Sequence, residues 1–134
     1  MQTVQQLEEF MTKPSGALVE DIKKIDGDIL ILGIAGKMGP TLAKLAKRAA
    51  EEAGIEKRII GVARFSNKEM KEELETAGIE TITCDLLDEE QLAQLPDIPN
   101  VIFMAGNKFG TVNNEHFTWA MNTYLPGRVG DKFK

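Results

Sequence analysis

The sequence predicts an α/β fold built on a doubly wound parallel sheet. An unbroken apolar run at residues 29–32 meets three glycines spaced three apart, and a helical pattern begins directly after them. Further short apolar runs at 58–63, 79–84 and 101–105 each follow a helical pattern. Strands that alternate with helices across short loops pair in parallel through right-handed crossovers. For such a sheet we expect the strand order 3-2-1-4, with the functional loops at the carboxyl ends of the strands.

Composition narrows the class of protein. A chain of 134 residues suits one domain with a hydrophobic core. Sixteen Lys and Arg against 21 Asp and Glu give a net charge of −5, which argues against nucleic acid or an anionic membrane as the partner. The single cysteine, Cys84, excludes an internal disulfide and a Cys-rich metal site. With no segment of membrane-spanning length and no signal-peptide pattern, we expect a cytoplasmic protein.

Residues 1–27 are predicted to form a helical extension before the first strand. Thr3 can cap a short helix in which Val4, Leu7 and Met11 recur at helical spacing, and a second amphipathic helix follows a Pro-Gly break. The extension has two interpretations, a packing or dimerisation element or a helical hairpin on the sheet edge. The second is favoured, because amphipathic helices usually bury their apolar stripe.

The glycine-rich turn after the first strand is the first candidate site. A dinucleotide pyrophosphate binds bare backbone N–H groups at a helix N-terminus, where no Cβ blocks its approach and the helix dipole favours negative charge. Pro40 supports the helix start, since its missing N–H costs no intrahelical bond there. The alternative is a glycine-rich turn without a ligand. The candidate contacts in this turn are Gly33, Gly36, Lys37, Met38 and Gly39.

The helix after the turn is predicted to pack on the sheet. Its apolar stripe follows the spacing i, i+4, i+7, i+11 and i+15, with charged residues on the other faces. The stripe consists of Met38, Leu42, Leu45, Ala49 and Ala53.

Capping and breaking residues divide the rest of the chain. Ser66 with Glu69 three residues later predicts a capping box for a third long helix, and Asp88 predicts the start of a short one. The last helix is expected to begin near Asn114. Pro126, followed by a glycine, is expected to kink or end it.

Four loops should meet at the carboxyl edge of the sheet, at residues 33–39, 64–67, 85–87 and 105–108. Together they resemble the N-terminal half of the extended short-chain dehydrogenase/reductase family, also called NAD-dependent epimerase/dehydratase, over about residues 28–125. The resemblance implies a Rossmann-type dinucleotide-binding domain at residues 28–134. That domain would be incomplete, truncated after the fourth strand and the helix that follows it.

The resemblance also assigns residues to the cofactor. Gly33-x-x-Gly36-x-x-Gly39 resembles the family's phosphate motif. Asp85 and Leu86 resemble the Asp-Leu signature whose acid contacts the adenine amine. Ala105 and Gly106 resemble the small residues beside the ribose and nicotinamide, and Asn122 resembles the family's helical asparagine. From the residues alone, Asp85 could instead cap a turn and Asn122 could be a surface residue.

The end of the second strand predicts the cofactor type. NAD-preferring sites place an acid there to bind the adenosine ribose. Here Arg64 offers a permanently charged fork to a 2′-phosphate, Ser66 and Asn67 add neutral donors, and Lys37 can approach from the other side. The sequence therefore predicts NADP in preference to NAD. The alternative is that both cations point to solvent.

Catalytic groups are not predicted within these residues. The family's Tyr-x-x-x-Lys pair has no match, because Tyr124 is followed by Arg128 across a Pro-Gly break. His116 is interpreted as a solvated residue, so no metal site is predicted. The resemblance implies a parent epimerase, dehydratase or reductase acting on a nucleotide-sugar or related carbonyl compound. A stand-alone NADP(H) sensor is the alternative. A homodimer through the open fourth-strand edge and the last helix is a further expectation.

Overall fold

The computed structural model describes residues 3–107 and 112–134 and has a four-stranded parallel sheet at its centre. The strand order is β3-β2-β1-β4, which confirms the predicted order. Lys108, the last residue of the fourth predicted loop, lies outside the described residues. The strands are β1 (Ile29–Leu32), β2 (Ile59–Ala63), β3 (Glu80–Thr83) and β4 (Asn100–Phe103).

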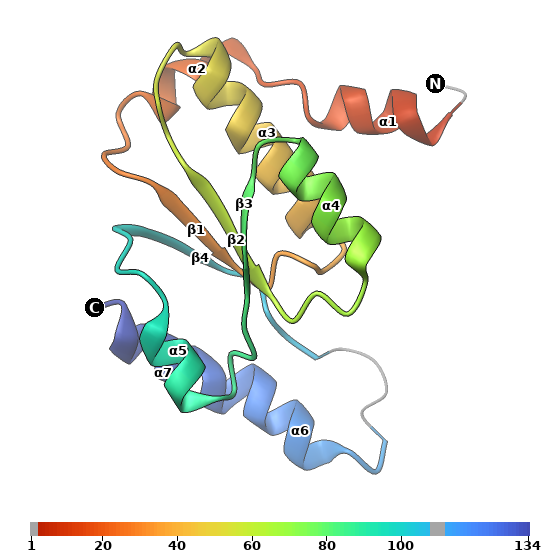
Figure 1. Ribbon diagram of the computed structural model, residues 1–134, viewed down its shortest axis with the longest axis vertical. Coiled ribbons are helices and arrows are strands. Elements are labelled where there is room, and N and C mark those ends of the chain that lie inside the picture. Colours follow the sequence, from red (N-terminus) through yellow and green to blue (C-terminus); the bar gives the residue numbers. More distant parts are fainter. Residues whose placement is uncertain (1–2, 108–111) are drawn as a thin grey trace.

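Helices cover both faces of this sheet, with α3 and α4 on one side and α5, α6 and α7 on the other (Figure 1). Two further helices, α1 and α2, precede the first strand, and α2 packs on α3. Across the described ranges, no helix is long and apolar enough to cross a membrane. The helices are α1 (Val4–Met11), α2 (Gly16–Ile22), α3 (Gly39–Glu52), α4 (Lys68–Thr76), α5 (Glu89–Gln94), α6 (Glu115–Trp119), the π-helix η1 (Ala120–Tyr124) and α7 (Leu125–Lys132).

The two halves of the core follow the alternation of side chains along the central strands. In β1, Ile29 and Ile31 face α3 and α4, whereas Leu30 and Leu32 face α5 and α7. All four side chains are buried, as expected for a parallel strand covered on both faces.

Small residues of α3 are buried against two neighbours: Ala43 packs in the cluster that contains the sheet, and Ala49 and Ala50 pack on Ile22 of α2. The buried residues of α3 are Gly39, Ala43, Ala49 and Ala50, whereas Met38, predicted to face inward, is 70% exposed. A Cβ added at Gly39 would stand only 2.0 Å from the carbonyl oxygen of Ile34. The start of α3 thus lies too close to Ile34, in the turn after β1, for a side chain at Gly39. Of the predicted stripe, Ala49 is buried, whereas Met38 is exposed and Leu42 and Leu45 are half-buried.

Side-chain caps start four of the helices. Thr3, Ser15 and Asp88 cap α1, α2 and α5, which confirms the expected roles of Thr3 and Asp88. The capping box predicted at Ser66 is wrong, because the side chain of Asn67 caps α4 by accepting from the backbone N–H of Met70. The two candidates are neighbours, and backbone geometry decides between them.

The last helical segment continues through Pro126, so the predicted end of the helix there is wrong, although a π-helical turn interrupts the regular α-helix just before it. Residues 120–124 form a π-helical turn, and α7 begins at Leu125 with Pro126 in its first turn. Proline clashes with the carbonyl four residues earlier in a regular α-helix, and the wider π turn placed before it relieves that conflict. The side chains of Tyr124 and Arg128 therefore lie on one continuous helical face.

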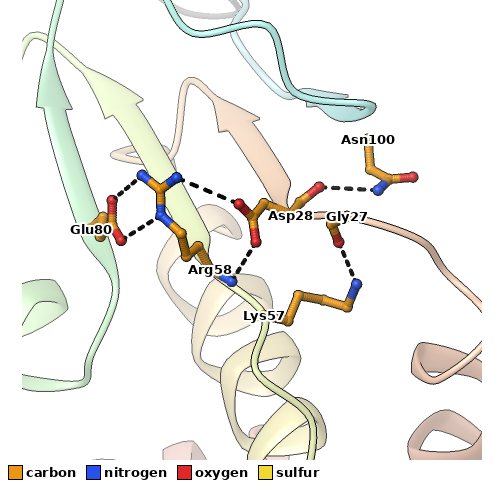
Figure 2. A network of polar contacts seen from close by, with 6 residues as sticks. All are labelled: Gly27, Asp28, Lys57, Arg58, Glu80 and Asn100. Atoms are coloured by element: carbon orange, nitrogen blue, oxygen red, sulfur yellow. Dashed lines mark hydrogen bonds and ion pairs between the residues drawn. The ribbon is translucent and has the colours of Figure 1, made fainter.

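A chain of polar contacts joins the amino ends of the strands in the order of the sheet (Figure 2). The Arg58 guanidinium donates to Glu80 of β3 at 2.8 and 2.7 Å, and Asp28 accepts from the backbone N–H of Arg58 at 2.8 Å. The Asn100 carboxamide then donates to the carbonyl of Asp28 at 3.0 Å. Lys57 donates to the carbonyl of Ile25 at 2.7 Å. The polar side chains at the amino ends of the strands are thus engaged in structural contacts.

Candidate functional site

One cavity of about 400 Å³ lies at the carboxyl ends of the strands, where the sheet order reverses. Residues from all four predicted loops line it, so the fold brings segments far apart in sequence to one place. The predicted site residues in its lining are Gly33, Gly36, Arg64, Ser66, Asn67, Asp85, Leu86, Ala105 and Gly106.

The three positions in the turn are occupied by glycine for different reasons. Gly33 has φ +84°, and an added Cβ would stand 2.6 Å from the backbone nitrogen of Ala105. Gly39 is required by the close approach of α3 to Ile34. At Gly36 an added Cβ would meet only the carbonyl oxygen of Gly33, at 3.5 Å. The packing of the protein does not require a glycine at Gly36, which leaves bare backbone open to the cavity.

The N-terminus of α3 stands beside this turn without a side-chain cap. Its N-cap residue, Met38, makes no side-chain hydrogen bond, in contrast to Thr3, Ser15, Asn67 and Asp88. Uncapped N–H groups at a helix start bind anions well, because the helix dipole favours negative charge there. The glycine turn and α3 thus fit a pyrophosphate.

The end of β2 supplies the polar wall of the cavity. Arg64 is exposed and makes no ion pair within the described part of the chain. Phe65 is buried with φ +49°, a left-handed conformation uncommon for an aromatic residue. Asn67 uses its side-chain oxygen to cap α4. This wall therefore places the Arg64 guanidinium, which makes no ion pair among the described residues, next to the buried Phe65.

The segment after β3 contributes Cys84, Asp85 and Leu86. Asp85 accepts from the backbone N–H of Leu87 at 3.1 Å, so it caps a turn, which was the alternative interpretation of this residue. Asp85 also lines the cavity. Burial, together with the nearby Asp85 and Asp88 carboxylates, raises the pKa of the Cys84 thiol. The thiol therefore stays protonated and behaves as a small buried group.

Asn122 holds the loop after β4 instead of lining the cavity. Its carboxamide accepts from the backbone N–H of Asn107 at 2.7 Å and donates to the Asn107 carbonyl at 2.8 Å. The Asn107 side chain in turn donates to Thr118 at 3.2 Å. These bonds set the position of Gly106, where an added Cβ would lie 3.3 Å from the Asn122 side-chain oxygen.

Four predicted site residues lie outside the cavity lining: Lys37, Met38, Gly39 and Asn122. Lys37 and Met38 are exposed in the turn, and Gly39 is buried. Sequence reasoning in turn missed most of the apolar lining, although Phe117 and Met121 are spaced by four on one helical face. The apolar residues that it did not assign to the site are Ala35, Ala63, Phe65, Met70, Cys84, Leu87, Met104, Phe117 and Met121.

The pair Tyr124 and Arg128 faces α5 and does not line the cavity. Arg128 donates to the Tyr124 hydroxyl at 2.7 Å and forms an ion pair with Glu89. The Arg128 guanidinium holds the pKa of Glu89 below its ordinary value. The helix does not end between the two residues, and the ion pair of Arg128 with Glu89 joins α7 to α5.

His116 is exposed near the start of α6. Over residues 3–107 and 112–134, the side chains do not gather three His, Cys, Asp or Glu into a group that could hold a metal ion.

Sheet order and helical layers together define an α/β domain of the Rossmann type, with a cavity at the carboxyl ends of its strands. The family model described as "NAD dependent epimerase/dehydratase family" matches residues 29–124, and the chain belongs to this family, whose members bind a nicotinamide dinucleotide. No curated protein matches the sequence.

Among solved structures, one described as "Crystal structure of Cj0485 dehydrogenase" is similar, with a TM-score of 0.63 and 19% identity. The likeness covers 84% of this chain and 47% of that one, so the chain spans about half the length of this neighbour. At this identity the likeness shows the fold alone.

Proposed function

We propose that the chain is the NADP(H)-binding portion of an NAD(P)-dependent epimerase, dehydratase or reductase. The observation that carries the proposal is the cavity that joins the glycine turn, Arg64, Asp85 and Gly106. Pyrophosphate would lie on the backbone of Gly36 and the start of α3. The adenosine would lie among the residues after β2 and β3, and the bound nicotinamide would supply hydride transfer.

The preference for NADP rests on Arg64. The segment after β2 holds no acid that would bind a ribose 2′-hydroxyl and repel a 2′-phosphate. A charged hydrogen bond is worth about 1.5–3 kcal/mol, so loss of the guanidinium should weaken NADP binding about ten- to a hundredfold. NAD has no 2′-phosphate, and its affinity should stay nearly constant.

Titration calorimetry with NADP and NAD tests this on the wild type and Arg64→Ala. Lys13→Ala, which removes one positive charge at an exposed residue outside the cavity lining, is the matched control and should bind both cofactors like the wild type. Equal affinity of the wild type for NADP and NAD, or an equal loss of both in Arg64→Ala, would refute the preference.

Under the same proposal, the chain alone has no catalytic activity. A parent substrate of the nucleotide-sugar or related carbonyl class follows from the family resemblance. The alternative is an NADP(H) sensor without chemistry, favoured by the cofactor cavity and by the engagement of Tyr124 away from it. Cofactor oxidation or reduction by the purified chain, abolished by a point substitution in the cavity, would contradict inertness.

A further inference from the structure

Asp85 is the acidic residue that the described part of the chain places in the cavity lining, in the turn that joins β3 to α5 (Figure 1). Its carboxylate oxygen Oδ1 accepts from the backbone N–H of Leu87 at 3.1 Å. Within the described residues, its other oxygen, Oδ2, receives no hydrogen bond. Since an ionised carboxylate accepts on both oxygens, Oδ2 can take a hydrogen bond from a ligand.

Gln91 of α5 holds the backbone of Asp85 from outside the cavity lining. The backbone N–H of Asp85 donates to Oε1 of Gln91 at 2.9 Å. The other end of the same carboxamide, Nε2, donates to Oδ2 of Asp88 at 3.0 Å. Asp88 itself caps α5, because its Oδ1 accepts from the backbone N–H groups of Glu90 and Gln91, both at 3.0 Å. A chain of hydrogen bonds therefore runs from Asp88 through the Gln91 side chain to the backbone of Asp85.

The charge of Asp88 decides which residue type can complete this hydrogen-bond chain. The backbone N–H of Gln91, and then its side chain, hold the pKa of Asp88 below its ordinary value, so Asp88 is a charged acceptor. It therefore attracts the NH₂ end of the Gln91 carboxamide, which turns Oε1 toward the Asp85 N–H. A glutamate at position 91 would have the same shape, but Asp88 would repel it. The position thus requires an amide.

We infer that Gln91 is a positioning residue of the cofactor site: it holds Asp85 so that its carboxylate selects a base with a hydrogen-bond donor. The inference rests on the proposed NADP(H) function, in which the adenosine lies among the residues after β2 and β3. Adenine carries an exocyclic amine, which donates to a carboxylate. Hypoxanthine carries a carbonyl oxygen at the same place, which only accepts. Gln91 therefore controls how well the site distinguishes the two bases, although it does not line the cavity.

Titration calorimetry with NADP and its deaminated analogue, nicotinamide hypoxanthine dinucleotide phosphate, tests this role. The two ligands carry the same charge, so the ratio of their affinities isolates the contact with the base. The wild type should bind NADP at least about tenfold more tightly than the analogue, because the analogue lacks a charged hydrogen bond. Gln91→Glu should reduce this ratio at least about threefold, since the repelled glutamate releases the Asp85 backbone. The ratio of NADP to NAD affinity, which rests on Arg64, should stay constant.

A double variant tests the hydrogen-bond chain itself. In Asp88→Asn combined with Gln91→Glu, the amide and the carboxylate exchange places. The introduced asparagine can cap α5 and donate to the introduced glutamate, which can accept from the Asp85 N–H. The double variant should therefore regain the wild-type preference for adenine. Gln94→Glu is the matched control: it makes the same change at another exposed glutamine of α5 and should behave like the wild type.

Amide hydrogen exchange, followed by NMR, measures the same hydrogen-bond chain without any cofactor. The Asp85 amide should exchange about two- to tenfold faster in Gln91→Glu, because its acceptor is lost. In the double variant its exchange should return to the wild-type rate. Circular dichroism checks that each variant is folded.

The inference is overturned if Gln91→Glu leaves the exchange rate of the Asp85 amide unchanged, or if the double variant is no better than the single one. It is also overturned if Gln91→Glu weakens NADP and the hypoxanthine analogue equally, which is the result of a merely structural role. A wild type that binds no NADP would refute the proposed function and this role together. That failure is distinguishable, because the exchange of the Asp85 amide would still respond to Gln91→Glu.

Discussion

The glycine turn separates residues that the fold requires from a residue that a ligand requires. Gly33→Ala places a Cβ 2.6 Å from backbone at a positive φ, and the left-handed backbone and the clash together should cost about 2–5 kcal/mol of unfolding free energy. Gly39→Ala meets backbone at 2.0 Å and should cost at least about 1–3 kcal/mol. Gly36→Ala meets nothing closer than 3.5 Å, and its stability should be unchanged or higher by about 0.4–1 kcal/mol.

Unlike stability, the affinity for NADP should depend on the glycine at position 36. If pyrophosphate lies on the Gly36 backbone, a methyl group there blocks a charged hydrogen bond and should weaken NADP binding about ten- to a hundredfold. Urea unfolding gives the stability of the three variants, and titration calorimetry gives the affinity of Gly36→Ala. Wild-type NADP affinity in Gly36→Ala, or a stability loss as large as that of Gly33→Ala, would refute the reasoning.

Three further predictions concern the scaffold. The Arg58 hydrogen bond lowers the pKa of Glu80, so this pair stabilises the fold above the unfolded-state pKa and ceases to do so as pH falls through the lower folded-state pKa. Glu80→Gln should therefore flatten the pH dependence of unfolding free energy below about pH 4.5, measured by urea unfolding. Asn122→Ala should speed hydrogen exchange of the Asn107 amide, followed by NMR, and weaken NADP binding about two- to tenfold. Leu125→Ala, at a side chain only 1% exposed, should cost about 2–5 kcal/mol in urea unfolding.

Strand order and the meeting of the four loops could be predicted because they follow from few rules. The apolar runs at β1 and β2 locate buried strands, and the right-handed crossover limits how parallel strands can be arranged. Their carboxyl ends then lie on one edge without any knowledge of side-chain contacts. This is why residues as distant as Gly33 and Ala105 could be assigned to one site.

Features that depend on a partner surface could not be predicted in the same way. The periodicity of α1 shows an apolar stripe, but the charges of Lys44 and Arg48 on α3 decide which side faces inward. The expectation that α1 buries this stripe is wrong, because no residue of the helix is buried. The rule for Pro126 assumes a regular α-helix, and a π turn removes the conflict. Asn122 has the sequence context of a cofactor contact, yet its carboxamide matches the Asn107 backbone.

The groups that line the cavity suit binding better than proton transfer. Among the polar side chains that the described residues place there, Arg64 contributes a guanidinium. One oxygen of the Asp85 carboxylate is bonded within a turn, and burial keeps the Cys84 thiol protonated. A general acid or base must reach the reacting group and change its protonation near the working pH, and the raised pKa of the Cys84 thiol does not suit it to that role. The cavity therefore supplies charge, bare backbone and apolar surface, the features on which the proposed cofactor binding rests.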